Sequence, residues 1–254
     1  MKSRTLTLAL LAATAGAAHA QFVYAVDTFN DLYYIDVDSG TSSLIGNTGT
    51  SALMESLAYD GFNLYGADAT GRFYSINEGT GAATLVANTS LGNLEGMDFA
   101  GSNLFATDFE DPTTVHQLDP ATGLPVGFSV TADASRGVAR ALTFSSDGSF
   151  AYTAQGSLGS QKLQSMTPFG VTAEIGALAF NTAAIQNLGN DRYIALGTSG
   201  QIYSLDVATG DMQLKHDLGD QFFLGVSTAP VPEPGTMAVL GLGLAAIARR
   251  RRKA

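Results

Sequence analysis

The chain has 254 residues, with 29 Gly, 7 Pro, no Cys and no Trp, and a formal net charge of −10 at neutral pH. Without cysteine it can form no disulfide, no thiolate metal site and no cysteine nucleophile. All 23 acidic residues lie between Asp27 and Glu233, where only six of the 13 Lys and Arg residues occur. Because such an acidic body repels phosphate backbones, the sequence predicts no nucleic-acid partner.

The first 20 residues, MKSRTLTLALLAATAGAAHA, have the three parts of a secretory signal peptide. Lys2 and Arg4 form a basic start, and an uncharged, mainly apolar stretch follows. Ala18 and Ala20 then supply the small side chains that a signal peptidase selects. We therefore predict a signal helix over residues 1–20, cleavage by signal peptidase before Gln21, and export of the body.

The body is followed by VPEPGTMAVLGLGLAAIARRRRKA. Residues 235–248 are apolar and uncharged, and although a full membrane span needs about 20 residues, flanking arginines can snorkel and extend a shorter one. The basic cluster after this run stays cytoplasmic under the positive-inside rule. The tail therefore predicts a short transmembrane helix with the body on the far side of the membrane, in agreement with the signal peptide.

The tail resembles the PEP-CTERM sorting signal, which consists of Pro-Glu-Pro, a short Gly/Ala/Leu-rich helix and an arginine cluster. The residues that match its motif are Pro232, Glu233, Pro234, Arg249, Arg250, Arg251 and Arg252. The resemblance implies a Gram-negative bacterium that makes exopolysaccharide, and processing by exosortase, a membrane-embedded enzyme. It also implies an inner-membrane intermediate, then display at the cell surface or in the extracellular matrix. An ordinary C-terminal anchor would give the same topology but would keep its tail.

The body contains five segments that share an apolar strand and a turn with a late glycine. They read YYIDVDSG, YSINEGTG, HQLDPATG, QSMTPFG and YSLDVATG, and their final glycines are 41, 42, 47 and 40 residues apart. In most of them an Asp or Asn can bond its own backbone at the start of the turn. The closing glycine can take a positive φ, which gives a tight hairpin. This pattern indicates an internal repeat of about 40 residues.

Two further markers recur in each repeat, which predicts four short strands per unit and an all-β, five-bladed β-propeller. In the second unit we expect strands at Leu57–Tyr59, Asn63–Ala67, Arg72–Ile76 and Ala82–Ala87. Phe223–Thr228 reads as an inner strand with no strand after it, so we expect it to join the first blade and close the ring. An open β-solenoid or a sandwich is the alternative. The predicted domains are residues 1–20, 21–229 and 230–254.

Charged side chains recur where inner strands begin and second strands end, and these two positions lie on the same face of a propeller. We expect one face to gather the candidate ligand or metal residues Asp27, Glu55, Asp68, Glu95, Asp108 and Arg140. Gly176 and Phe222 take the matching inner-strand positions in the other two blades. Carboxylates suit Ca²⁺, and a carboxylate pair suits cleavage of a glycosidic bond. The alternative interpretation is that strand-end aspartates only shape turns.

The sequence favours an exported, exosortase-sorted protein of the cell surface or of an exopolysaccharide or biofilm matrix, with a binding or structural role. An extracellular glycosidase or lyase that uses the propeller carboxylates is the first alternative, and a Ca²⁺-dependent adhesin is the second. His116 and His216 are isolated strand histidines, which argues against a zinc site or a Ser-His-Asp triad. We assign no catalytic residue and expect no cofactor other than Ca²⁺, and the identity of any metal stays open.

Overall fold

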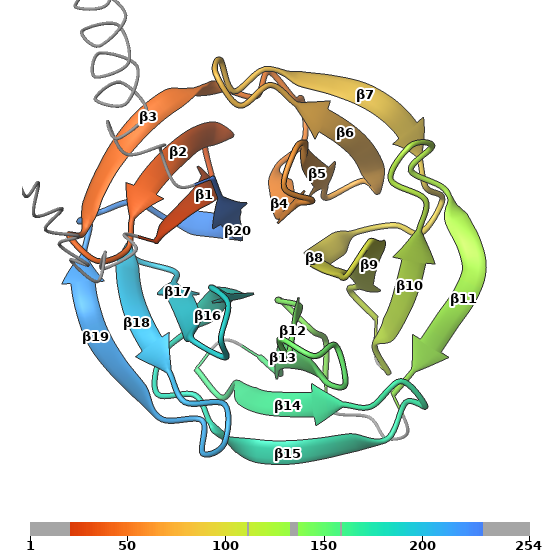
Figure 1. Ribbon diagram of the computed structural model, residues 1–254, viewed down its shortest axis with the longest axis vertical. Helices are drawn as coiled ribbons and strands as arrows, with labels where there is room; N and C mark the ends of the chain where they lie inside the picture. Colours follow the sequence, from red (N-terminus) through yellow and green to blue (C-terminus); the bar gives the residue numbers. More distant parts are fainter. Residues whose placement is uncertain (1–20, 111, 133–136, 158, 231–254) are drawn as a thin grey trace, which may run out of the picture.

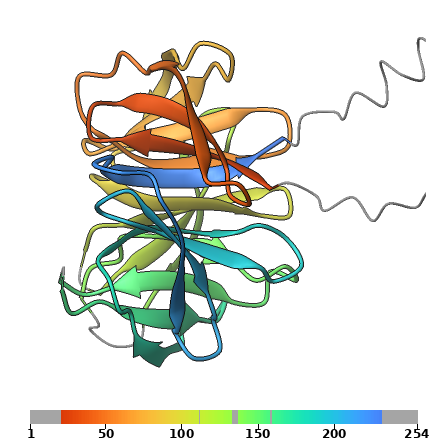
Figure 2. The ribbon, with the colours of Figure 1, turned by 90° about the vertical axis from the view of Figure 1, so that its left-hand side faces the viewer.

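The computed structural model describes residues 21–110, 112–132, 137–157 and 159–230. In this part of the chain, twenty strands form five four-stranded antiparallel sheets. The sheets stand like blades around a central axis, and the outermost strand of each blade lies on the rim (Figure 1). Seen from the side, the described body is a disc, and its first strand begins and its last strand ends on the same side of it (Figure 2). The predicted five-bladed propeller is thus confirmed.

Within each blade the strands follow one another from the axis to the rim. Blade 1 contains β20 (Phe223–Ala229), β1 (Phe22–Asp27), β2 (Asp31–Asp36) and β3 (Thr41–Asn47). Blade 2 contains β4 (Met54–Tyr59), β5 (Leu64–Asp68), β6 (Arg72–Ile76) and β7 (Ala83–Asn88). Blade 3 contains β8 (Leu94–Ala100), β9 (Asn103–Asp108), β10 (Thr114–Leu118) and β11 (Pro125–Thr131).

The last two blades follow the same order. Blade 4 contains β12 (Thr143–Phe144), β13 (Ala151–Gln155), β14 (Lys162–Met166) and β15 (Thr172–Ala177). Blade 5 contains β16 (Thr182–Asn187), β17 (Tyr193–Gly197), β18 (Gln201–Leu205) and β19 (Met212–Asp217). The strands expected in the second unit agree with β5 to β7 to within one residue, whereas β4 begins three residues earlier than expected, at Met54.

The ring closes through its last strand, as the sequence predicted. β20 pairs antiparallel with β1, so that the two ends of the described body form one sheet. Phe223 is fully buried and packs edge-on against Tyr33, with 5.8 Å between ring centroids. This pairing removes the two free strand edges that an open ring would expose to other chains.

The recurring glycine ends the turn between the third and fourth strands of every blade. Each of the five has a positive φ: Gly40 (70°), Gly81 (78°), Gly123 (69°), Gly170 (81°) and Gly210 (82°). L-residues with side chains rarely adopt this conformation, so glycine is the residue that suits this turn. The shared backbone requirement explains why the repeat was visible in the sequence.

Two expected positions in the inner strands are wrong. Gly176 lies in the outer strand β15, and the inner strand of blade 5 is β16, which begins after the apolar stretch that we expected to form it. That stretch includes Phe180, which stacks on Tyr203 with 4.5 Å between ring centroids. In blade 1 the pairing of β20 with β1 gives Leu224, not Phe222, the matching position. Apolar side chains occur in the connections of this protein as well as in its strands. The sequence pattern therefore took an apolar connection for an inner strand.

The inner strands approach one another so closely that the central channel is narrow at its waist. A Cβ atom on Gly96 of β8 would lie 2.5 Å from the backbone nitrogen of Leu142, and one on Gly225 of β20 would lie 2.9 Å from Cα of Ser56. The space left at this level is about 10 Å³, too small for more than one water molecule. The channel therefore has two separate mouths.

The predicted signal helix of residues 1–20, the predicted transmembrane helix and the sorting-motif residues lie outside the described residues. In the described part of the chain, no helix is long and apolar enough to cross a membrane.

Candidate functional site

One mouth, here called the Glu55 mouth, is lined by Glu55, Glu95, Arg140, Ala183, Thr198, Phe222 and Leu224. Four of these residues occupy one position in their inner strands, where the pairing register with the second strand shifts: Glu55, Glu95, Ala183 and Leu224. Irregularities of this kind change the direction of a side chain relative to the regular pleat. The structure thus brings together three of the six predicted site residues: Glu55, Glu95 and Arg140.

At the Glu55 mouth, Glu95 and Arg140 form an ion pair between blades 3 and 4. Arg140 Nη1 donates to Glu95 Oε2 at 3.0 Å, and Asn93 Nδ2 donates to Glu95 Oε1 at 3.0 Å. The guanidinium also lies over the Phe109 ring, 4.9 Å from its centroid. Burial raises the pKa of Glu95, while Arg140 and Asn93 act in the opposite direction.

Glu55 is the most perturbed acid at this mouth. Burial, and then the negative charge of Glu95, raise its pKa to about 7, against the opposing effect of Arg140. The cavity beside it has a volume of about 40 Å³, and a water molecule occupies about 30 Å³ in the liquid. The Glu55 mouth can therefore exchange a proton and hold water, but it has no room for a sugar ring.

The three predicted aspartates are buried in the turns that follow the second strands. Asp68 Oδ1 accepts from the backbone nitrogens of Thr70 (2.9 Å) and Arg72 (3.1 Å), and its Oδ2 accepts from the hydroxyl of Tyr74 at 2.7 Å. These bonds satisfy the carboxylate within its own blade and lower its pKa despite burial. Asp68 is therefore a turn residue, as the alternative interpretation proposed.

The other two aspartates are bound in the same way. Asp27 Oδ1 accepts from the backbone nitrogens of Phe29 and Asp31, at 2.8 and 3.0 Å. Asp108 Oδ1 accepts from the backbone of Thr114, and its Oδ2 lies 3.0 Å from Nε2 of His116. In the described residues, no three His, Asp or Glu side chains gather in a way that would hold a metal ion. A Ca²⁺ site on this face stays a prediction.

The opposite end of the channel, here called the Asp98 mouth, contains a network that the sequence analysis missed. Asp98 Oδ2 accepts from the Thr143 hydroxyl (2.8 Å) and the Phe144 backbone nitrogen (3.2 Å), and its Oδ1 accepts from the Phe99 backbone nitrogen (2.8 Å). The Thr143 hydroxyl in turn accepts from the backbone nitrogen of Asn187 at 2.9 Å. The network therefore ties together the inner strands of blades 3, 4 and 5.

Burial raises the pKa of Asp98 to about 6, although these hydrogen bonds lower it. At neutral pH the carboxylate is therefore ionised in its buried position. Its charge is stabilised by donated hydrogen bonds, which are stronger to an ionised acceptor than to a neutral one.

Two further acceptors at the Asp98 mouth have no partner among the described residues. Gln186 is 3% exposed and Ser227 is 1% exposed, yet Gln186 Oε1 and Ser227 Oγ make no hydrogen bond there. Both residues occupy the inner-strand position that Asp98 holds in blade 3 and Thr143 holds in blade 4. An unpaired buried polar atom costs about 1–3 kcal/mol, and a buried water molecule commonly supplies the partner. Of these two residues, Gln186 also lines the cavity at this mouth.

The Asp98 mouth opens into a cavity of about 700 Å³. Its lining combines rings with amides, hydroxyls and carboxylates, and includes Tyr59, Asp98, Phe99, Asn103, Phe144, Ser146, Asp147, Gln186 and Asn187. This volume lies within the range of small-molecule sites, about 300–1,000 Å³. A sequence signal for the site did exist, because Asp98 is a charged residue inside the inner strand GMDFA.

The body resembles known propellers only distantly. A chain in the crystal structure of a nidogen/laminin complex is 14% identical, with a TM-score of 0.55 over 84% of this chain and 86% of that chain. A protein of unknown function from Bacteroides caccae is 11% identical, with a TM-score of 0.52 over 80% of this chain and 77% of that chain. At such low identity these likenesses show the fold alone.

A comparison with curated protein sequences gives no match. The family profile of the PEP-CTERM protein-sorting motif, in contrast, matches residues 230–253. The chain therefore carries a five-bladed β-propeller followed by a PEP-CTERM protein-sorting motif, as the resemblance of its last residues implied.

Proposed function

We propose that this protein is exported, is processed through its C-terminal motif by an exosortase-like enzyme, and acts outside the cell as a saccharide-binding module. The ligand site is the Asp98 mouth. The observation that carries this assignment is a cavity of about 700 Å³ lined by a buried carboxylate, Asp98, and by Gln186, whose Oε1 has no partner among the described residues. The polysaccharide matrix of the cell supplies the ligand.

Sugar hydroxyls have the chemistry that these groups need. A hydroxyl donates one hydrogen bond and accepts two, so it can donate to Gln186 Oε1 or to Asp98 and accept from a neighbouring amide. Asn103, at the same cavity, brings an amide group that donates as well as accepts, whereas the Asn187 amide already donates to Phe144 and Ser146. The rings of Tyr59, Phe99 and Phe144 add apolar surface beside these polar groups, as in most small-molecule sites.

Charge restricts the ligand further. Asp98 and Asp147 both line the cavity, and the chain carries a formal net charge of −10. An acidic saccharide would be repelled by these carboxylates. The ligand is therefore a neutral saccharide, and the roughly 700 Å³ cavity has room for one or two sugar rings.

Binding can be tested by calorimetry on the exported protein with a panel of neutral mono- and disaccharides. We expect Gln186→Leu to weaken binding at least about tenfold, equivalent to about 1.4 kcal/mol. Glu55→Gln is the matched control, because it changes one polar group at the opposite mouth. Equal affinities for Gln186→Leu and the unmodified protein would overturn the assignment of the site.

Sorting can be tested separately in the producing bacterium. Pro232→Ala combined with Pro234→Ala disrupts the Pro-Glu-Pro element, and replacing residues 249–252 by glutamine removes the cytoplasmic charge. Both variants should accumulate unprocessed at the inner membrane, whereas the unmodified protein should reach the surface or the matrix. Normal processing of both variants would show that the motif does not direct sorting in this chain.

A glycan-cleaving enzyme is the second candidate, because Glu55, with a pKa of about 7, lies beside Glu95, which is paired with Arg140. A proton-holding acid next to a second carboxyl group is the pattern that glycosidases use. The cavity of about 40 Å³ between them opposes this function. Turnover of a neutral polysaccharide that disappears in Glu55→Gln, without loss of folding, would establish the enzyme and displace the binding module.

A further inference from the structure

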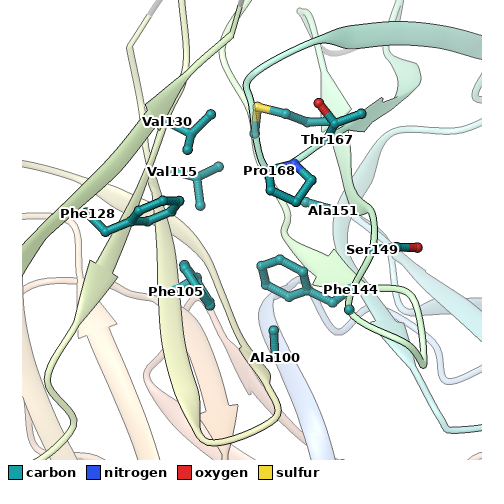
Figure 3. Close-up of a pocket in the computed structure, with 12 residues that line it drawn as sticks. Ala100, Phe105, Val115, Phe128, Val130, Phe144, Ser149, Ala151, Thr167 and Pro168 are labelled. Carbon is teal, nitrogen blue, oxygen red and sulfur yellow. The ribbon is translucent and has the colours of Figure 1, made fainter.

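A second, apolar cavity lies between blades 3 and 4, next to the Asp98 mouth. Its volume is about 100 Å³. Figure 3 shows Phe105, Val115, Phe128 and Val130 on one side of the space, facing Phe144, Ala151 and Pro168 on the other. Blade 3 supplies the first four residues and blade 4 supplies the others.

Local structure explains why the two blades leave this space. The inner strand of blade 4, β12, has two residues, whereas the inner strand of blade 3, β8, has seven. From β13, blade 4 contributes only the small side chain of Ala151 to the cavity wall, and this residue is 6% exposed. A short inner strand and a small side chain therefore leave unfilled a volume that large residues occupy in well-packed cores.

The apolar cavity adjoins the Asp98 mouth. Ala100, Phe105, Phe144 and Gly148 line both spaces. The Phe105 and Phe144 rings lie against each other, 5.1 Å apart, and so form a shared wall. Beside them Ala100 and Gly148 are small, and a Cβ atom on Gly148 would reach only to 3.9 Å from Cβ of Ala100. Ala100 and Gly148 thus extend this wall, and a substituent on a sugar bound at the mouth would reach the cavity over the wall and not through it.

We propose that the saccharide bound at the Asp98 mouth carries an apolar substituent, such as an acyl ester, which occupies the cavity between blades 3 and 4. This inference rests on the proposed function and adds the class of saccharide to it. An apolar cavity of about 150 Å³ in another protein stays dry and binds benzene, so a space of about 100 Å³ suits a phenyl ring or a short branched acyl chain. Filling a dry apolar space is favourable because it removes apolar ligand surface from water.

The test compares matched methyl and phenyl glycosides of glucose, galactose and mannose by calorimetry on the exported protein. We expect the phenyl glycoside of the preferred sugar to bind at least about tenfold more tightly than its methyl glycoside. Ala151→Leu should remove this preference, because the added atoms fill the cavity, and should leave the methyl glycoside affinity unchanged. Ala151 does not line the Asp98 mouth cavity.

A second variant covers the case in which Ala151→Leu fails to fold. Phe128 is 44% exposed, so Phe128→Ser should fold, and it removes one apolar wall of the cavity. It should reduce the phenyl preference at least about threefold. Phe169→Ser is the matched control, because Phe169 is 91% exposed and does not line the cavity; it should change nothing.

The outcomes separate this inference from the proposed function. Equal affinities of the methyl and phenyl glycosides would overturn the apolar subsite and leave saccharide binding intact. Phenyl glycoside binding that is insensitive to Gln186→Leu would overturn the saccharide site, and with it this inference. No binding of any glycoside would overturn both. A phenyl preference that survives both Ala151→Leu and Phe128→Ser would place the apolar group elsewhere.

Discussion

The two mouths of the channel are built from the same five inner strands, yet they stabilise buried charge in different ways. At the Glu55 mouth, an arginine pairs with Glu95, and the space left is about 40 Å³. At the Asp98 mouth, hydrogen-bond donors surround the carboxylate, and two buried acceptors stay unpaired beside about 700 Å³ of open cavity. Both mouths contain buried polar atoms that have no partner among the described residues, Arg140 Nε and Asn93 Oδ1 at the first and Gln186 Oε1 and Ser227 Oγ at the second. The mouths differ in how they balance the charge and in the space beside it.

The two mouths are separate because the inner strands pack closely at the waist of the channel. Gly96→Ala tests how tightly these strands pack there. The new methyl group would meet the backbone nitrogen of Leu142 at 2.5 Å, and backbone cannot move aside as a side-chain end can. We expect a loss of about 3 kcal/mol in the free energy of unfolding, at the upper end of overpacking effects. Chemical denaturation measures it.

Gly79→Ala is the control for that substitution. Gly79 lies in an exposed turn without a positive φ, and the nearest atom to its added Cβ would be 3.5 Å away. We expect a change below about 0.5 kcal/mol, as for most surface sites. Similar losses for Gly96→Ala and Gly79→Ala would mean that the inner strands can separate, and that the two mouths are not independent.

Thr143→Val probes the hydrogen-bond network of the Asp98 mouth at nearly constant volume. The hydroxyl that is lost donates to Asp98 Oδ2 and accepts from the Asn187 backbone. Because its removal leaves two buried groups with one partner fewer, we expect a loss of about 2 kcal/mol and a further rise in the Asp98 pKa. Denaturation and carboxyl titration by NMR measure the two effects.

Thr107→Val is the matched control for Thr143→Val. Thr107 is also fully buried, but its hydroxyl makes only a long bond of 3.5 Å, to the carbonyl of Gly96. The loss should stay below about 1 kcal/mol, with no change in the Asp98 titration. An unchanged Asp98 pKa in Thr143→Val would show that the network does not hold this carboxylate.

The sequence predicted the fold better than the site because the two depend on different kinds of information. Gly40, Gly81 and their equivalents recur because each blade needs the same backbone turn. The repeat of about 40 residues could therefore be recognised in the sequence. Asp98, Thr143 and Gln186 share one position in three inner strands but differ in residue type, and a repeat search discards such differences. The strand-end aspartates repeat because each accepts hydrogen bonds in a turn, so repetition alone does not distinguish a structural aspartate from one that binds a ligand.

Glu55→Gln should stabilise the protein at alkaline pH. Burial raises the pKa of Glu55 from its ordinary value of 4.5 to about 7, so the folded state binds the proton more tightly than the unfolded state. Glu55 therefore takes away stability as the pH rises from about 4.5 to about 7. Each unit of this pKa shift corresponds to about 1.4 kcal/mol of stability. Because water at the mouth screens the charge, we expect Glu55→Gln to raise the free energy of unfolding at alkaline pH by roughly 2 kcal/mol, less than the full shift would give.

The measurement is the free energy of unfolding as a function of pH for Glu55→Gln and for the unmodified protein. The two curves should meet near pH 4 and separate toward pH 8, with the variant above. Asp98, with a pKa of about 6, gives both proteins the same additional decline between about pH 4 and pH 6. A constant difference across this range would mean that Glu55 acts through packing and not through its charge.

Arg140→Gln should give the smallest effect, and its pH dependence distinguishes charge from packing. Arg140 lowers the pKa of both Glu55 and Glu95, so its loss raises both values and makes stability fall more steeply as the pH rises. Because the arginine side chain is 27% exposed, we expect a cost of about 1 kcal/mol at pH 8. The cost should be near zero at pH 4, where the glutamates are protonated.

An equal cost at both pH values would assign the role of Arg140 to its stacking on Phe109. A cost confined to high pH would identify the Glu55 mouth as a site whose acids are balanced by an arginine, in contrast to the Asp98 mouth, where hydrogen-bond donors surround the carboxylate.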